Sequence, residues 1–102
     1  MEFKGKKVLI ADDEPDILEI ISYNLRNEGY ETITAKDGED ALHKSKVYRP
    51  DLIVLDVMMP NKNGMEVCQS LRSQPNFRDT LIIFLTALSD ETSHIKGLEY
   101  GA

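Results

Sequence analysis

Four apolar residues stand between two aspartates in the stretch Asp51-Leu52-Ile53-Val54-Leu55-Asp56. A short run of branched residues that is apolar on both faces is typical of a strand buried in a parallel sheet. Two other stretches have the same character, Lys7–Ala11 and Leu81–Leu85. Residues 30–35 instead alternate threonines with apolar residues, which predicts a less covered strand at an edge of the sheet.

Segments of helical period separate these runs. Pro15 opens the first, because a proline at the first helical position loses no hydrogen bond, and Gly29 is placed to cap its end. Pro50 ends the second, since the residue before a proline avoids the α region. A fourth helix is expected at about residues 90–100. The apolar positions of the first three helices are Ile17, Leu18, Ile21 and Leu25; Ala41, Leu42 and Val47; and Met65, Val67, Cys68 and Leu71.

Buried strands that alternate with amphipathic helices predict an α/β fold, a parallel sheet with helices on both faces. The chain has 102 residues, 41% hydrophobic and 29% charged, which suits one globular domain over residues 1–102. A formal charge of −6 disfavours direct binding to nucleic acid or to an anionic membrane. The single Cys68 excludes an internal disulfide framework and suits a reducing cytosol, so we expect a cytoplasmic location. Residues 8–11 are too short an apolar run for a signal peptide or a membrane span.

Polar residues follow each of the three buried strands. Asp12 and Asp13 come directly after the first, Asp56 ends the second and Thr86 follows the third. If these strands are neighbours, three carboxylates and a hydroxyl converge at the carboxyl edge of the sheet, where ligands bind in such folds. Like charges this close need a counterion, and Mg²⁺ accepts carboxylates while keeping positions open for a phosphate oxygen.

The carboxylate that is not needed to hold the metal can act as a nucleophile toward a phosphoryl group. Thr86 can then donate a hydrogen bond to a phosphoryl oxygen, and the small Ala87 leaves the approach open. For any one aspartate alone, helix capping or solvation is the more common role, and Asp13 or Glu14 can cap the helix that begins at Pro15. The conjunction of all these positions favours a metal site.

The chain resembles the receiver domain of bacterial two-component response regulators over essentially its whole length. The stretches that match are Val8-Leu9-Ile10-Ala11-Asp12-Asp13-Glu14-Pro15, Asp51-Leu52-Ile53-Val54-Leu55-Asp56-Val57-Met58-Met59-Pro60 with Gly64, Leu85-Thr86-Ala87, and Gly97 with Gly101-Ala102. This combination of motifs is highly specific.

The resemblance implies a flavodoxin-like three-layer α/β/α fold with strand order 2-1-3-4. It implies that Asp56 is the phosphoacceptor and a metal ligand, that Asp12, Asp13 and the Met58 carbonyl also hold Mg²⁺, and that Thr86 is the switch hydroxyl. The implied partners are a sensor histidine kinase, a DNA-binding output domain outside this chain that controls transcription, and a second copy in a homodimer. It implies a signalling domain rather than an enzyme.

Receivers normally continue past the position of Gly101-Ala102 into a fifth strand that ends in a Lys-Pro pair, and then a fifth helix. We therefore expect a chain that is truncated before these elements. If the chain instead ends as written, its sheet has four strands and Leu81–Leu85 is an exposed apolar edge. Two other classes stay open. A phosphatase of the haloacid-dehalogenase type also uses an Asp nucleophile with magnesium, but it usually has a second Asp where Met58 stands. A receiver-like module that takes no phosphate usually lacks one of the three aspartates.

Overall fold

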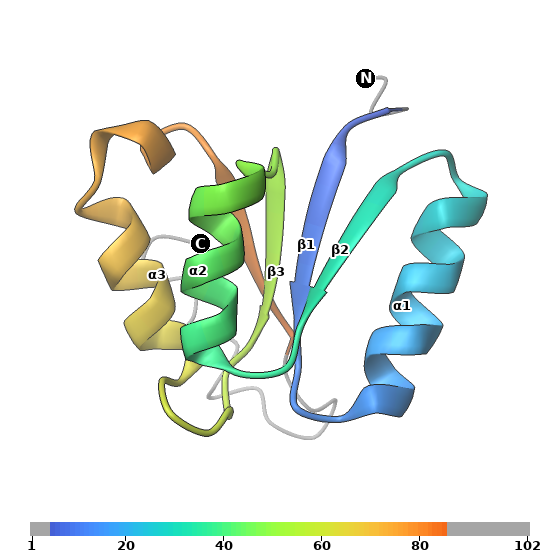
Figure 1. The fold of residues 1–102 in the computed structure, drawn as a ribbon, viewed down its shortest axis with the longest axis horizontal. Coiled ribbons are helices and arrows are strands. Elements are labelled where there is room, and N and C mark those ends of the chain that lie inside the picture. The colour runs from blue at the N-terminus through green and yellow to red at the C-terminus, as the bar shows by residue number, and fades with distance from the viewer. Residues whose placement is uncertain (1–4, 86–102) are drawn as a thin grey trace.

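A computed structural model describes residues 5–85 of the chain. Its core is a parallel sheet whose strands lie in the order β2-β1-β3-β4. The strands are β1 (Lys7–Ala11), β2 (Glu31–Ala35), β3 (Leu52–Asp56) and β4 (Leu81–Leu85). Their carboxyl ends all point toward the same edge of the sheet, at the bottom of Figure 1. The predicted parallel sheet and its strand order are confirmed, and so is the edge position of β2.

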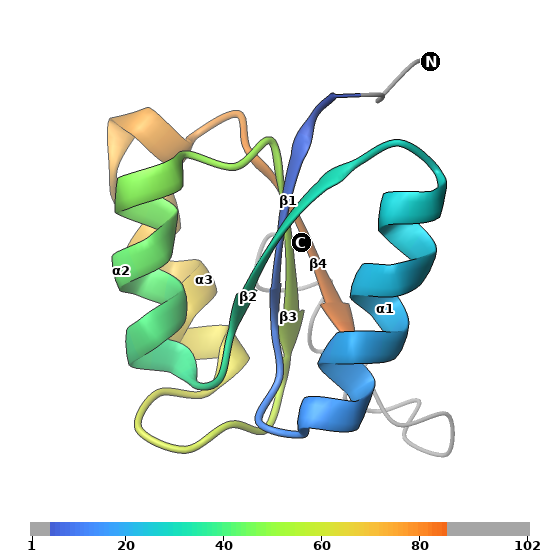
Figure 2. The same cartoon turned by 45° about the vertical axis from the view of Figure 1, so that its right-hand side comes forward.

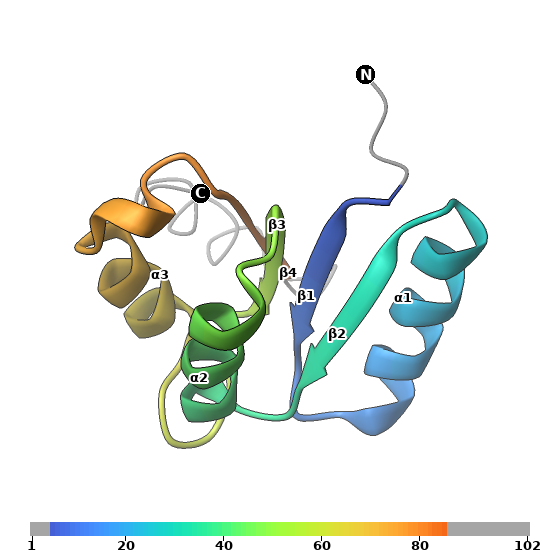
Figure 3. The same cartoon turned by 45° about the horizontal axis from the view of Figure 1, so that its top comes forward.

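Helices cover both faces of the sheet and make the three layers of a flavodoxin-like α/β/α fold. Helix α1 (Pro15–Asn27) lies on one face, and α2 (Gly38–Tyr48) and α3 (Gly64–Arg72) lie on the other. Figure 2 shows the sheet nearly edge-on between these two layers, and Figure 3 shows the same separation from above. A short 3-10 helix, η1 (Pro75–Phe77), precedes β4 and was not predicted.

Two apolar clusters occupy the two sides of the sheet because strand side chains alternate between faces. Leu9, Ile53 and Leu55 are fully buried under α2 and α3, together with Val67, Cys68 and Leu71 of α3. Val8, Ile10 and Val54 point to the other face, where Leu18, Ile21 and Leu25 of α1 pack on them. The apolar stripe predicted for the first helix is therefore its contact with the sheet.

Strand β4 differs from the prediction of a buried strand. Ile82 is 2% exposed beneath the α2–α3 layer, whereas Leu81 and Ile83, on the face that α1 covers, are 54% and 49% exposed. The composition of β4 resembles that of β1, but among the elements of residues 5–85 the helix on this face, α1, packs mainly on β1 and β2. The alternative expectation of an apolar edge at Leu81–Leu85 agrees with this exposure.

Helix ends follow their sequence signals with one exception. Pro15 occupies the first turn of α1, and Gly29, with φ of 97°, follows the end of the helix in the left-handed conformation that glycine tolerates best. Of Asp13 and Glu14, which the sequence offered as alternative caps, Glu14 is the N-cap residue, but it makes no side-chain cap bond. Pro50 follows the end of α2 as predicted.

Within residues 5–85, none of the helices has both the length and the apolar character that crossing a membrane requires.

Candidate metal centre at the carboxyl ends of the strands

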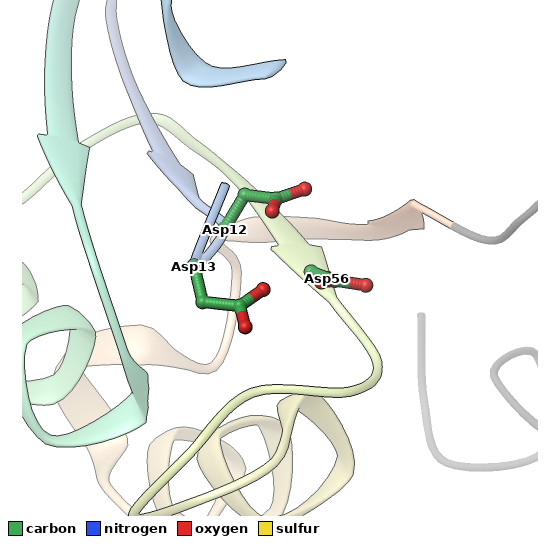
Figure 4. A group of neighbouring side chains, drawn as sticks. All are labelled: Asp12, Asp13 and Asp56. Carbon is green, nitrogen blue, oxygen red and sulfur yellow. The ribbon is translucent and has the colours of Figure 1, made fainter. Parts of the chain in front are cut away.

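Three aspartates meet where two neighbouring strands end. Asp12 and Asp13 follow β1, and Asp56 is the last residue of β3. The two strands pair in register, with Ala11 opposite Leu55, so the residues that follow these two positions lie side by side. Figure 4 shows the three carboxylates projecting from the strand ends toward the same side. The predicted convergence of these side chains is confirmed.

The carboxylates are close enough to share one cation. Each aspartate offers an oxygen, and these oxygens all lie within 4.8 Å of one another. Asp12 is buried, with 6% of its surface exposed, whereas Asp56 is half-buried and Asp13 is exposed. A donor set made of carboxylate oxygens at a partly open position suits a hard cation such as Mg²⁺, which keeps several of its waters.

Backbone amides orient two of the three carboxylates. The Glu14 N–H donates to Asp12 Oδ1 at 2.8 Å, so the buried carboxylate is held by the first turn after β1. The Met58 N–H lies 3.4 Å from Asp56 Oδ1, a long hydrogen bond that still favours the ionised form of Asp56. The turns that follow β1 and β3 therefore set the directions of these side chains.

The carboxylates of the cluster repel one another and are partly removed from water. Burial, followed by the negative charge of Asp12, raises the pKa of Asp56 to about 6. Burial also raises the pKa of Asp12, with a smaller contribution in the same direction from Asp13, while the Glu14 N–H lowers it. A divalent cation would reverse these shifts, because an opposite charge at ligand distance favours ionised carboxylates.

The predicted site also includes Thr86, Ala87 and the Met58 carbonyl. Thr86 and Ala87 lie outside the described residues, as does the predicted helix at about residues 90–100. Met58 lies two residues after Asp56, and its side chain is 75% exposed. The role of the Met58 carbonyl as a metal ligand stays a prediction.

One contact near the site was not predicted. The Asp37 side chain accepts hydrogen bonds from the Asp40 N–H at 2.8 Å and from Asn61 Nδ2 at 3.0 Å. The first bond caps α2 and the second joins α2 to the loop after β3. In the sequence, Asp37-Gly38 indicated only a turn, and nothing in the residues around Asn61 marked it as the partner of Asp37.

The family model of the response regulator receiver domain matches residues 8–102. This match includes all three aspartates of the cluster and nearly the whole chain. The chain belongs to the response regulator receiver family.

Curated relatives agree with this assignment. The alkaline phosphatase synthesis transcriptional regulatory protein PhoP of Bacillus subtilis is 50% identical over 98 residues, which are 96% of this chain and 40% of PhoP. A probable transcriptional regulator, ycf27, of Cyanophora paradoxa is 49% identical over 102 residues, 100% of this chain and 41% of the relative. The receiver chain thus spans about two-fifths of the length of these relatives.

A solved structure supports the fold in the same way. The chemotaxis response regulator CheY4 of Vibrio cholerae superimposes with a TM-score of 0.88 at 36% identity, covering 97% of this chain and 82% of CheY4. The similarity extends over the sheet and its helices, so the receiver fold does not depend on the local motifs alone.

Proposed function

We propose that residues 1–102 form a receiver domain in which Asp56 accepts a phosphoryl group from a sensor histidine kinase. The observation that carries this proposal is the approach of three carboxylates within 4.8 Å at the ends of β1 and β3. Asp12 and Asp13 hold Mg²⁺ together with Asp56 and the Met58 carbonyl. When bound, the ion neutralises negative charge on the carboxylates and on the incoming phosphoryl oxygens.

The residues of the chain perform the transfer as follows. An Asp56 carboxylate oxygen forms a bond to phosphorus while the bond between phosphorus and the donor's imidazole nitrogen breaks, and the imidazole then takes up a proton. The pKa of Asp56 near 6 leaves this carboxylate mainly ionised at neutral pH, as a nucleophile must be. The Thr86 hydroxyl donates to a phosphoryl oxygen, and the small Ala87 leaves room for it.

Phosphorylation adds a charge of roughly −1.5 to −2 at this edge of the sheet. A change of this size can reposition Thr86 and the segment after it, and this is the switch that we propose. The chain assists only its own phosphorylation and dephosphorylation, in the cytoplasm. Since the relatives of greater length are named transcriptional regulators, we propose that the switched receiver controls a DNA-binding output. The resemblance to response regulators is the ground on which we also propose a homodimer.

Incubation with acetyl phosphate and Mg²⁺, followed by phosphate-affinity electrophoresis, tests the acceptor. The wild-type chain should acquire one slow-migrating band that disappears in EDTA, and Asp56→Asn should acquire none. Asp79→Asn is the matched control, because it removes the same charge from an exposed position beyond η1. Equal labelling of wild type and Asp56→Asn would exclude Asp56 as the acceptor. Sustained turnover of a phosphomonoester would instead indicate a phosphatase.

A further inference from the structure

The loop of residues 57–63 joins β3 to α3 and leads directly away from Asp56. Its base is closed by the Gly64 N–H, which donates to the Val57 carbonyl at 2.9 Å. Gly64 has no room for a side chain, since a Cβ there would lie 2.3 Å from the Asp56 carbonyl oxygen. The two ends of the loop are therefore held together next to the backbone of Asp56.

The far part of the loop is held by α2. Asn61 Nδ2 donates to Asp37 Oδ2 at 3.0 Å, and the other oxygen of Asp37 accepts the Asp40 N–H that caps the helix. Gly38 approaches the same part of the loop, because a Cβ at this residue would lie 2.0 Å from the Lys62 carbonyl oxygen. One carboxylate thus fixes the start of α2 and the loop together.

Asn61 is suited to this position by its backbone. Its φ is 70°, in the left-handed region that asparagine adopts more readily than most residues with a side chain. The Lys62 N–H donates to the Pro60 carbonyl at 2.8 Å, which tightens the turn on either side of Asn61. The Asn61 amide, on an exposed residue, donates to Asp37 at the start of α2.

From this arrangement we infer that Asp37 and Asn61 are positioning residues of the metal site, because their hydrogen bond fixes the loop that carries Met58. This inference rests on the proposed function, in which the Met58 carbonyl is a ligand. Met58 lies between the closed base of the loop and the Asn61 anchor, so the path of its backbone is constrained on both sides. Groups that orient metal ligands commonly change metal affinity by about tenfold or more when they are removed.

The test measures the affinity of the chain for Mg²⁺ without any phosphodonor. Backbone amide signals are recorded by NMR while the chain is titrated with MgCl₂. Asn61→Gly removes the amide and keeps a residue that tolerates the left-handed backbone. Asp37→Ser keeps a side chain that can cap α2 but cannot reach Asn61 in the same way. We expect the Mg²⁺ dissociation constant to rise roughly three- to tenfold in each variant. The double variant should be no weaker than the weaker single one, because both changes remove one interaction.

Two matched controls separate positioning from other effects. Glu39→Gln removes a negative charge from an exposed position in the first turn of the same helix, and Asn76→Ala removes an exposed amide from η1, before β4. Both controls should keep the wild-type dissociation constant. Melting temperatures measured in EDTA report on the stability of each variant. We expect Asn61→Gly and Asp37→Ser to keep melting temperatures close to that of the wild type while their Mg²⁺ affinity falls.

The outcomes distinguish this inference from the function on which it rests. Absence of saturable Mg²⁺ binding by the wild-type chain would overturn both. Normal binding by the wild type and equal binding by Asn61→Gly and Asp37→Ser would overturn only the positioning role. A lower melting temperature in EDTA with unchanged Mg²⁺ affinity would also overturn it, since the link would then serve stability alone.

Discussion

Replacement of Asp56 by asparagine should stabilise the metal-free chain at neutral pH. The substitution keeps the size of the side chain and removes one of three neighbouring negative charges. The pKa of Asp56 rises from 3.8 to about 6 on folding, which corresponds to about 3 kcal/mol at 1.36 kcal/mol per pKa unit. Because Asp56 is only half-buried, solvent screening reduces this to about 1–2 kcal/mol. We expect the melting temperature in EDTA at pH 7.5 to rise by roughly 5–10 °C.

The effect has a defined dependence on pH. A carboxyl group whose pKa is raised on folding binds its proton more tightly in the folded state, so folding is favoured most below the unfolded pKa, near 4. That contribution is lost as the pH rises through about 6, and above this value the wild type carries the full cost of the charge. The difference between Asp56→Asn and the wild type should therefore be largest at pH 7.5 and should fall to about half at pH 5.

Thermal unfolding followed by far-ultraviolet circular dichroism measures this difference, with Asp79→Asn as the control for net charge. Mg²⁺ should raise the melting temperature of the wild type and narrow the gap, because the ion offsets the repulsion that the substitution relieves. Equal melting temperatures for wild type and Asp56→Asn in EDTA at pH 7.5 would refute the electrostatic reasoning. An equal rise in melting temperature for Asp79→Asn would also refute it.

Three further outcomes are expected. Mg²⁺ affinity should fall by roughly tenfold per pH unit below about pH 6, because protons compete with the ion for Asp56. Titrations with Mg²⁺ at pH 7.5 and pH 5 measure this change, and equal affinities at the two pH values would contradict it. Gly38→Ala should lower the free energy of unfolding, measured in urea, by about 1–3 kcal/mol. The clash of the new Cβ with the Lys62 carbonyl outweighs the roughly 0.5–1 kcal/mol that alanine gains over glycine in a helix. A more stable variant would show that the loop moves to accommodate the Cβ. Leu9→Ala should lower the free energy of unfolding by about 2–5 kcal/mol and Ile20→Ala by less than about 0.5 kcal/mol, because Leu9 is 0% and Ile20 is 58% exposed. Similar losses in the two variants would contradict the assignment of Leu9 to the core.

The strands were predictable because their apolar runs are short, continuous and bounded by residues that end strands. The bounds of β1 and β4 match the predicted Lys7–Ala11 and Leu81–Leu85. The burial of β4 was not predictable in the same way. An apolar residue such as Ile83 carries the same local signal whether or not a helix packs on its face. What covers a strand depends on elements distant in sequence, and periodicity does not contain that information.

The carboxylate cluster was predictable from the order of residues because parallel strands bring their carboxyl ends to one edge. The link between Asp37 and Asn61 was not, since it joins two loops that are 24 residues apart. An aspartate before a helix is expected to cap that helix, and Asp37 does cap α2. Its second hydrogen bond depends on how closely Gly38 allows the loop to approach, which only the packed structure reveals.

Adjacent aspartates that look equivalent in the sequence have different roles in the folded chain. Asp12 is buried and accepts the Glu14 N–H, whereas Asp13 is exposed. Asp12 therefore carries a desolvation cost that Asp13 does not, and its charge contributes more than that of Asp13 to the raised pKa of Asp56. Without a cation this arrangement destabilises the fold, and the buried residues of β1 and β3 on either side of the sheet offset that cost. The same repulsion favours binding of a divalent cation, which under the proposed function is the Mg²⁺ that lies beside the phosphoacceptor Asp56.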